Sequence, residues 1–278
     1  MTESTSRRQF RDILSRPDAA VDLAEASLLI ACEEYPELDV PAYLTRLEAM
    51  GSALRERLAD EPRPERAVMA LNRYLFQEEG FHGNAEEYYD PRNSYLNEVL
   101  DRRMGIPISL STVYMEVARR AGLRVEGVGM PGHFIVRVRA GPHAILIDPF
   151  YAGALLSETD CQQRLDRIFG GRLKMEASML APCGRKDILE RTLRNLKTIY
   201  FKQGDHLRAL GAVELLLTVN PDSAEDVRDR GVLYAALDCY GLAVRDLEAF
   251  LTLVPRAPEA SEVRDQLVDL RRRAARLN

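Results

Sequence analysis

The chain has 278 residues, of which 46% are hydrophobic and 29% are charged. This composition is typical of folded globular domains and excludes a disordered or collagen-like chain, and the length predicts two domains. The formal net charge of −5 argues against binding to nucleic acid through a net positive field, so nucleic acid is not an expected partner. The sequence predicts neither a membrane-spanning helix nor a secretory leader, so we expect a cytoplasmic protein without membrane contact.

The first quarter of the chain predicts a layer of helices. A candidate helix start at Ser15 is followed by Pro17, which suits a first helical turn. Apolar residues then recur at helical spacing in three further segments, residues 21–35, 40–58 and 65–79. These helices are expected to pack beside the segment that follows them.

The middle of the chain predicts helices followed by an antiparallel sheet. A helix over 97–104 and a second from Pro107 to Ala121 come first, the second ending at a glycine suited to the left-handed cap. Three short segments rich in β-branched residues then predict a strand and a β-hairpin: 124–130, 133–140 and 143–150.

The hairpin is expected to turn at Gly141 and Pro142. Within its first strand, Arg137 and Arg139 alternate with valines. This alternation predicts one sheet face toward solvent and the other toward a helix.

The last third of the chain contains an internal repeat of 34 residues, which is the tetratricopeptide period. Three pairs of identical residues have this spacing: Tyr200 and Tyr234, Ala209 and Ala243, Pro221 and Pro255. The pattern predicts two helical hairpins, 190–223 and 224–257, closed by a capping helix from about Glu259 to Leu277 whose arginines face solvent. We therefore expect domains at 1–185 and 186–278, with an α+β core followed by an all-α repeat domain.

The cysteines and glycines predict no metal site and no cofactor. The four cysteines contain no CxxC pair, so neither a zinc site nor a disulfide framework is indicated. No glycine-rich phosphate-binding loop occurs either. Reduced thiols in structural positions are expected: Cys32, Cys161, Cys183 and Cys239.

Residues 90–150 contain the most informative pattern for chemistry. A helix is followed by a strand, by His133 near the start of the next strand, and by Asp148 at the end of the strand after it. This order resembles the papain-like and transglutaminase-like core. The resemblance implies a cysteine nucleophile at the helix start, a histidine base and an aspartate that orients the histidine. Pro107 stands where that cysteine would be.

The resemblance extends over nearly the whole chain, from about Leu28 to Pro255. The motifs NEVLDRRMGIPISL and PGHFIVR, followed by tetratricopeptide repeats, resemble the bacterial SirB family of this superfamily. That resemblance implies the fold, and a regulatory role without a settled biochemical activity.

The candidate site residues each have a structural alternative. His133 and Asp148 are the main candidates, although Asp-Pro often simply begins a turn. Ser109 is the candidate replacement nucleophile, with Ser111 as a second, although serines in a first helical turn commonly cap backbone amides. The amides of Asn93 and Asn97 are candidate binding groups in the same cleft, with hydrogen bonding at the helix start as their alternative.

Two functions compete. The first is a non-catalytic scaffold or regulator that binds a protein or peptide partner through the cleft and the repeats. The second is an amide hydrolase or acyl transferase that uses Ser109 or Ser111 with His133 and Asp148. Because Pro107 cannot act as a nucleophile, the scaffold is preferred. Direct binding to nucleic acid is supported only by one cluster of arginines: Arg102, Arg103, Arg119 and Arg120. These side chains more simply form surface ion pairs. The pattern leaves the oligomeric state open.

Overall fold

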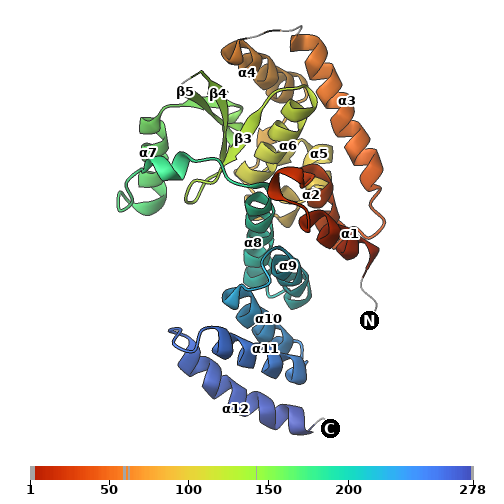
Figure 1. Cartoon of the computed structure of the whole chain (residues 1–278), viewed down its shortest axis with the longest axis vertical. Coiled ribbons are helices and arrows are strands. Elements are labelled where there is room, and N and C mark those ends of the chain that lie inside the picture. Colours follow the sequence, from red (N-terminus) through yellow and green to blue (C-terminus); the bar gives the residue numbers. More distant parts are fainter. Residues whose placement is uncertain (1–3, 59–60, 62, 142, 277–278) are drawn as a thin grey trace. The chain divides into compact units, whose positions relative to one another are not determined.

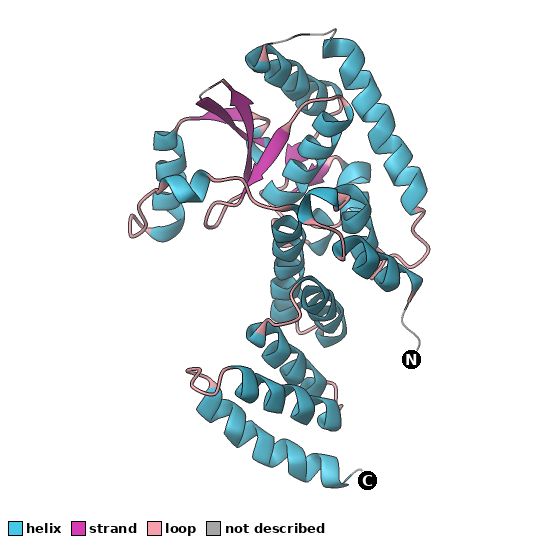
Figure 2. Cartoon of the chain, in the orientation of Figure 1, coloured by secondary structure: helices cyan, strands magenta, loops and turns pink. Residues whose placement is uncertain are grey.

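The computed structural model describes residues 4–58, 61, 63–141 and 143–276. Contacts divide the chain into two compact units, Met1–Thr192 and Leu193–Asn278. The helix α8 (Arg185–Gln203) runs across this division. The predicted domain boundary at 185/186 falls where that helix begins, and the α+β class with an all-helical C-terminal part is confirmed (Figures 1 and 2).

The first unit begins with a helical region. Its elements are α1 (Thr5–Leu14), α2 (Leu23–Ala31), α3 (Val40–Leu58), α4 (Pro64–Asn72) and the π-helical turn η2 (Arg73–Glu78). The predicted helix start at Ser15 is wrong, because Ser15 is the C-cap of α1. The α region is disfavoured for the residue before Pro17, which stops the helix there, and Phe10, Ile13 and Leu14 already form its buried face.

The helix α6 (Pro107–Arg120) lies at the centre of the first unit and is buried along nearly its whole length. The short helix α5 (Leu96–Arg102) precedes it, and Gly122 follows it with φ +86°, as the sequence predicts. A two-stranded parallel ladder, β1 (His82–Gly83) with β2 (Met104–Gly105), was not predicted. It ties the loop after β1 to the start of α6.

The main sheet is an antiparallel meander whose strand order follows the sequence. Its strands are β3 (Val125–Val128), β4 (Ile135–Ala140), β5 (His143–Asp148) and β6 (Ala154–Leu156). The predicted hairpin is present, since Ala140 pairs with His143 around Gly141 at φ +62°; Pro142 lies outside the described residues. The strand β6 was not predicted, because three residues give too little alternation to recognise.

The two sheet faces differ in their cover. One face contacts α6 and α4. The other face carries Ile135, Arg137 and Leu146, which the register places together. The expectation that this second face meets solvent is only partly correct, because α7 (Glu158–Phe169) covers part of it through Cys161 and Leu165. Two short 3-10 turns, η4 (Pro149–Tyr151) and η5 (Ala177–Leu180), flank β6 and α7.

The second unit consists of antiparallel helices. After the C-terminal part of α8 come α9 (His206–Val219), α10 (Ala224–Ala236), α11 (Tyr240–Leu253) and α12 (Ala260–Arg276). Equivalent residues of the 34-residue repeat share the core positions, since Ala209, Val213, Ala243 and Leu247 are all fully buried. The arginines of α12 lie on its exposed face through Arg273; the side chain of Arg276 lies outside the described residues. Across the described ranges, no helix is both long and apolar enough to cross a bilayer.

Candidate functional site

A tight turn places His133. Residues Met130 to His133 form a β-turn closed by the His133 amide, which donates to the Met130 carbonyl at 3.2 Å. Pro131 supplies the fixed φ of the second position, and Gly132 supplies the third position at φ +71°. This is the type II pattern. His133 therefore lies in the loop two residues before β4, close to its predicted place at the strand start.

Asp148 at the end of β5 is fully buried and holds three donors. His133 Nε2 lies 2.8 Å from Asp148 Oδ2, and Arg164 Nη2 lies 3.0 Å from the same oxygen. The Phe150 amide donates to Oδ1 at 3.1 Å. The structure thus brings the predicted His133–Asp148 pair together. The structure also places the Arg164 guanidinium beside the carboxylate. The negative charge of Asp148 therefore has a counter-charge that does not depend on His133.

Arg164 and Arg191 are two arginines of this site that sequence reasoning missed. Arg164 extends from α7 and stacks 4.5 Å above the ring of Tyr151, and its buried Nε has no hydrogen-bond partner within the described ranges. Arg191 extends from α8, and its Nη2 donates to the carbonyls of Met130 and His133 at 2.9 and 2.8 Å. Arg191 thereby fixes the turn that carries His133. Neither arginine has a sequence signal, since both lie on helices that follow the motif.

Four aromatic rings form a connected group that reaches His133 through two of its members, and we call them the aromatic patch: Tyr88, Tyr89, Phe150 and Tyr151. Their centroids are linked by edge-to-face contacts of 5.4 Å (Tyr88–Tyr89), 6.0 Å (Tyr88–Phe150) and 5.1 Å (Phe150–Tyr151). The imidazole lies 6.4 Å from Phe150 and 6.3 Å from Tyr151. Tyr89 and Tyr151 are 61% and 52% exposed. In the sequence, two aromatic doublets were the available signal for this patch: Tyr88-Tyr89 and Phe150-Tyr151. The second doublet directly follows Asp148-Pro149.

The predicted serine nucleophiles are both buried in α6. Ser109 Oγ donates to the Asn93 carbonyl at 2.6 Å and accepts from the Ile106 amide at 3.1 Å. Ser111 Oγ has no hydrogen-bond partner within the described residues. Neither hydroxyl is hydrogen-bonded to His133. The capping interpretation therefore describes the observed contacts of Ser109.

Asn93, one of the two predicted binding amides, anchors the loop that carries Tyr88 and Tyr89. Asn93 Nδ2 donates to the Glu87 carbonyl at 2.7 Å, and Asn93 Oδ1 accepts from Asn84 at 3.2 Å. Asn93 is fully buried, and Asn97 is 4% exposed with its Oδ1 unpartnered among the described residues. No hydrogen bond joins either amide to His133 in the parts of the chain that the structure describes. The observed contacts of Asn93 therefore support the loop from within.

Gly83 allows this loop to approach Phe150 closely. A Cβ atom at Gly83 would lie 2.6 Å from the Phe150 carbonyl oxygen and 2.7 Å from its ring. We expect Gly83→Ala to lower the free energy of unfolding by about 1 to 3 kcal/mol, because the backbone or the ring must shift. Thermal unfolding followed by circular dichroism measures this. Gly241→Ala is the control, since its Cβ would meet no atom within 4 Å; equal melting temperatures for both variants would contradict the close approach.

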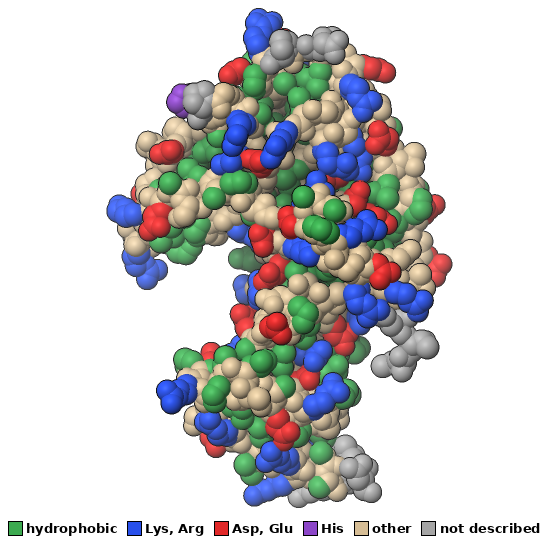
Figure 3. Space-filling model, in the orientation of Figure 1, with side chains coloured by type: hydrophobic (Ala, Val, Ile, Leu, Met, Phe, Trp, Pro, Cys, Tyr) green, Lys and Arg blue, Asp and Glu red, His purple; other side chains and the backbone are tan. Residues whose placement is uncertain are grey.

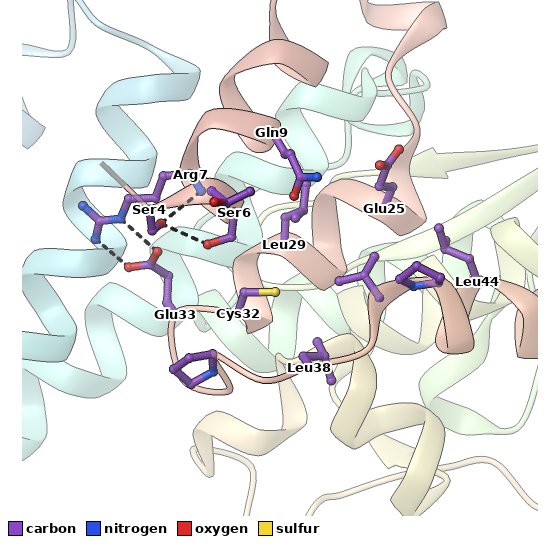
Figure 4. Close-up of a pocket in the computed structure, with 14 residues that line it drawn as sticks. Ser4, Ser6, Arg7, Gln9, Glu25, Leu29, Cys32, Glu33, Leu38 and Leu44 are labelled. Carbon is purple, nitrogen blue, oxygen red and sulfur yellow. Dashed lines mark hydrogen bonds and ion pairs between the residues drawn. The ribbon is translucent and has the colours of Figure 1, made fainter. Parts of the chain in front are cut away.

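Three of the four cysteine thiols are unsuited to nucleophilic chemistry: Cys32, Cys161 and Cys183. The structure records all four as free, and burial raises the pKa of Cys161 and of Cys183 to about 11. Burial and then the neighbouring Glu33 raise the pKa of Cys32. Cys32 lines a separate cavity of about 680 Å³ between α1, α2 and the start of α3, beside the Arg7–Glu33 ion pair (Figure 4). A protonated thiol is a poor nucleophile, so Cys32, Cys161 and Cys183 fit structural positions. Cys239 is exposed at the N-cap of α11.

One group of carboxylates in the described residues is close enough together to hold a cation: Glu225, Asp226 and Asp229. Lys197 Nζ lies 2.8 Å from Asp226 and from Asp229, and 3.1 Å from Glu225. The ammonium group therefore already supplies the positive charge that a metal ion would bring.

The arginine cluster considered for nucleic-acid binding is engaged in ion pairs. Arg102 pairs with Asp90, Arg103 with Glu79, and both Arg119 and Arg120 with Glu116. The prediction of ion pairs is confirmed, with the correction that Arg120 is buried. Basic and acidic side chains are interspersed on the face seen in Figure 3.

Comparisons with known proteins agree with this architecture. A family model described as the transglutaminase-like superfamily matches residues 41–194, and a tetratricopeptide repeat model matches residues 196–268. A UPF0162 protein of Xylella fastidiosa is 37% identical over 97% of both chains. A UPF0162 protein of Pseudomonas aeruginosa is 32% identical over 95% of this chain and 96% of its own, and UPF0162 protein YchA of Escherichia coli is 29% identical over 86% and 90%.

The fold, the His133–Asp148 pair and the two family models define the class as a transglutaminase-like core followed by tetratricopeptide repeats. Within that class, the chain belongs to the UPF0162 family. Pro107 begins α6, at the helix start where the superfamily resemblance places a cysteine nucleophile.

Proposed function

We propose that this protein is a non-catalytic, cytoplasmic interaction scaffold or regulator that binds a protein partner through the aromatic patch and the repeat helices. One observation carries the proposal. The site keeps the His133–Asp148 pair at 2.8 Å, but Pro107 begins α6, and no described hydroxyl or thiol is hydrogen-bonded to the imidazole. A histidine and an aspartate with no hydroxyl or thiol beside them can position and recognise a ligand, but they lack the nucleophile of the cysteine-type mechanism.

The surface around His133 supports recognition of another protein. Tyr89 and Tyr151 expose large rings, and exposed aromatic side chains are enriched where proteins bind one another. Tetratricopeptide repeats stack helical hairpins into binding surfaces, which supports a second contact region. The resemblance to the SirB family supports a regulatory rather than a metabolic role.

The alternative is an amide hydrolase or acyl transferase with Ser109 or Ser111 as nucleophile. It requires a serine hydroxyl within hydrogen-bond reach of His133. Ser109 instead donates to the Asn93 carbonyl, and Ser111 Oγ has no hydrogen-bond partner among the described residues. Because no observed contact favours it, the enzyme is the second choice.

Site-specific crosslinking tests the scaffold. A benzoylphenylalanine placed at Tyr89 is expected to capture a protein partner that the same group at Met69 does not capture, since Met69 is equally exposed, at 67%, but lies on α4. The captured partner is then purified, and its affinity is measured for wild type, for the double variant Tyr89→Ala and Tyr151→Ala, and for Met69→Ala.

The double variant is expected to bind at least about tenfold more weakly, and Met69→Ala as well as wild type. Equal affinities for all three proteins would contradict a role for the aromatic patch. Cleavage or acylation of the partner that depends on Ser109 would overturn the non-catalytic proposal and establish the enzyme.

A further inference from the structure

Two side chains beside the aromatic patch keep hydrogen-bond donors that have no acceptor within the described parts of the chain. These donors are the Tyr88 hydroxyl and the Nε and Nη1 atoms of Arg191. Tyr88 lies against Phe150, and Arg191 holds the turn that ends at His133. Donors that converge without an acceptor indicate a ligand that supplies oxygen atoms.

Arg191 also lacks a counter-ion. Its hydrogen bonds go only to the backbone carbonyls of Met130 and His133, and no ion pair with a carboxylate occurs among the described residues. Burial lowers the pKa of the Arg191 guanidinium, although the group stays protonated at neutral pH. A half-buried positive charge with no counter-charge is electrostatically unfavourable, and an anion that binds there relieves the cost.

Tyr88 and His133 stand next to this charge. Burial raises the pKa of Tyr88, so its hydroxyl is a donor throughout the neutral range, and Tyr88 interacts electrostatically with Arg191. The imidazole uses Nε2 for Asp148, and the turn that ends at His133 accepts two hydrogen bonds from Arg191.

The rest of the surface restricts which anion fits. Glu86 and Glu87 are exposed on the loop that carries Tyr88, and neither forms an ion pair with a described residue. Their charges oppose a ligand with several negative groups. The exposed rings of Tyr89 and Tyr151 instead favour a ligand that carries an apolar group close to a single negative group.

We propose that this site binds the C-terminal carboxylate of a peptide whose last residue is apolar. In a C-terminal residue the carboxylate and the apolar side chain are attached to the same carbon atom, Cα. The carboxylate then meets Arg191 and Tyr88 while the side chain packs on Phe150 and Tyr151. This inference rests on the proposed function, since it names the part of the partner that the aromatic patch recognises.

Fluorescence anisotropy with three labelled hexapeptides tests the proposal on the full-length protein. The first peptide ends in phenylalanine with a free acid, the second is its C-terminal amide, and the third has an amidated end and an internal glutamate. We expect the free acid to bind about tenfold more tightly than either of the others, as for loss of one hydrogen bond to a charged group.

Two variants assign the carboxylate to the named donors, and Arg172→Gln on the exposed surface is the charge-matched control. Arg191→Gln is expected to abolish the preference for the free acid. Tyr88→Phe keeps the ring and removes only the hydroxyl oxygen, so it is expected to reduce the preference by a factor of about 3 to 10 without changing the affinity for the amide. It also keeps the test decisive if Arg191→Gln disturbs the turn at His133.

Three outcomes would overturn the proposal. Equal affinity for the free acid and the amide would show that the site does not recognise the carboxylate. Equal affinity for the peptide with the internal glutamate would show that the carboxylate need not be C-terminal. A preference that survives both variants would place the carboxylate elsewhere. In each case the scaffold stands if the crosslinked partner still depends on Tyr89 and Tyr151, so the two failures are distinguishable.

Discussion

Replacement of Lys197 by methionine is expected to lower the free energy of unfolding of the second unit by about 3 to 5 kcal/mol. The Lys197 side chain is 9% exposed, and its ammonium group contacts the carboxylates of Glu225, Asp226 and Asp229. Asp226 is fully buried. Methionine fills a similar volume but leaves this carboxylate with much less positive charge, because among the described residues only Arg194 still pairs with it, at 3.3 Å.

The pH dependence of stability provides a second readout. Burial by itself would raise the pKa of Asp226, but hydrogen bonds from Lys197 and Ser223 outweigh it and hold this pKa below the ordinary 3.8. A carboxyl group with a depressed pKa contributes stability above its unfolded pKa, and the contribution is lost as the pH falls through the folded pKa. The wild-type unit therefore loses stability below about pH 3.8.

In the Lys197→Met variant the main cause of the depressed pKa is gone. The difference in stability between the two proteins is therefore expected to shrink as the pH falls toward 4, because protonation relieves the uncompensated carboxylates. Urea unfolding with hydrogen exchange of the α10 amides measures this in the second unit. Arg208→Met removes an exposed pair with Asp205 and is the control, with an expected cost below about 1 kcal/mol; a comparable loss in both variants would contradict a special role for Lys197.

Replacement of Asp148 by alanine is expected to destabilise the first unit by about 3 to 5 kcal/mol. The change leaves the Arg164 guanidinium without its carboxylate and also removes the acceptor for the Phe150 amide and for His133. Asp148→Asn preserves the shape and an oxygen acceptor, so it should cost less. The shift in melting temperature for a unit of this size is about 2 to 4 °C per kcal/mol.

His133→Ala is the matched control, because it removes one partner of Asp148 and leaves the ion pair with Arg164 intact. Its expected cost is about 1 kcal/mol, the worth of one hydrogen bond. This order of effects would show that Asp148 is held mainly by Arg164. If His133→Ala costs as much as Asp148→Ala, the imidazole is the principal partner and that interpretation is wrong.

Local chemistry made much of the fold predictable. The Pro131-Gly132 turn, the cap at Gly122 and the hairpin at Gly141 each follow from the conformations that these residues allow. The repeat was visible because Ala209 and Ala243 must stay small in a closely packed position, and both are fully buried. Such features are encoded within a few residues of where they act.

Features that depend on distant segments were not predictable from one sequence. Arg164 and Arg191 reach the site from α7 and α8. The sequence around each arginine contains no motif that indicates a contact with His133 or Asp148. Ser109 and Asn93 were candidates by residue type, with local hydrogen bonding as the alternative for each. Only the fold reveals that Ser109 donates to the Asn93 carbonyl and that Asn93 donates to the Glu87 carbonyl. The π-helical turn at 73–78 likewise has no periodic signature in the sequence.

The meander order of the main sheet has a consequence for how the chain folds. Each strand pairs with its neighbour in the sequence, as Val125 does with Val138 and Ala140 with His143. Pairing therefore closes only short loops, and the entropy lost before the first contacts form is small. The strands that hold His133 and Asp148 in place can thus assemble from one continuous stretch of chain, without waiting for a distant segment to arrive.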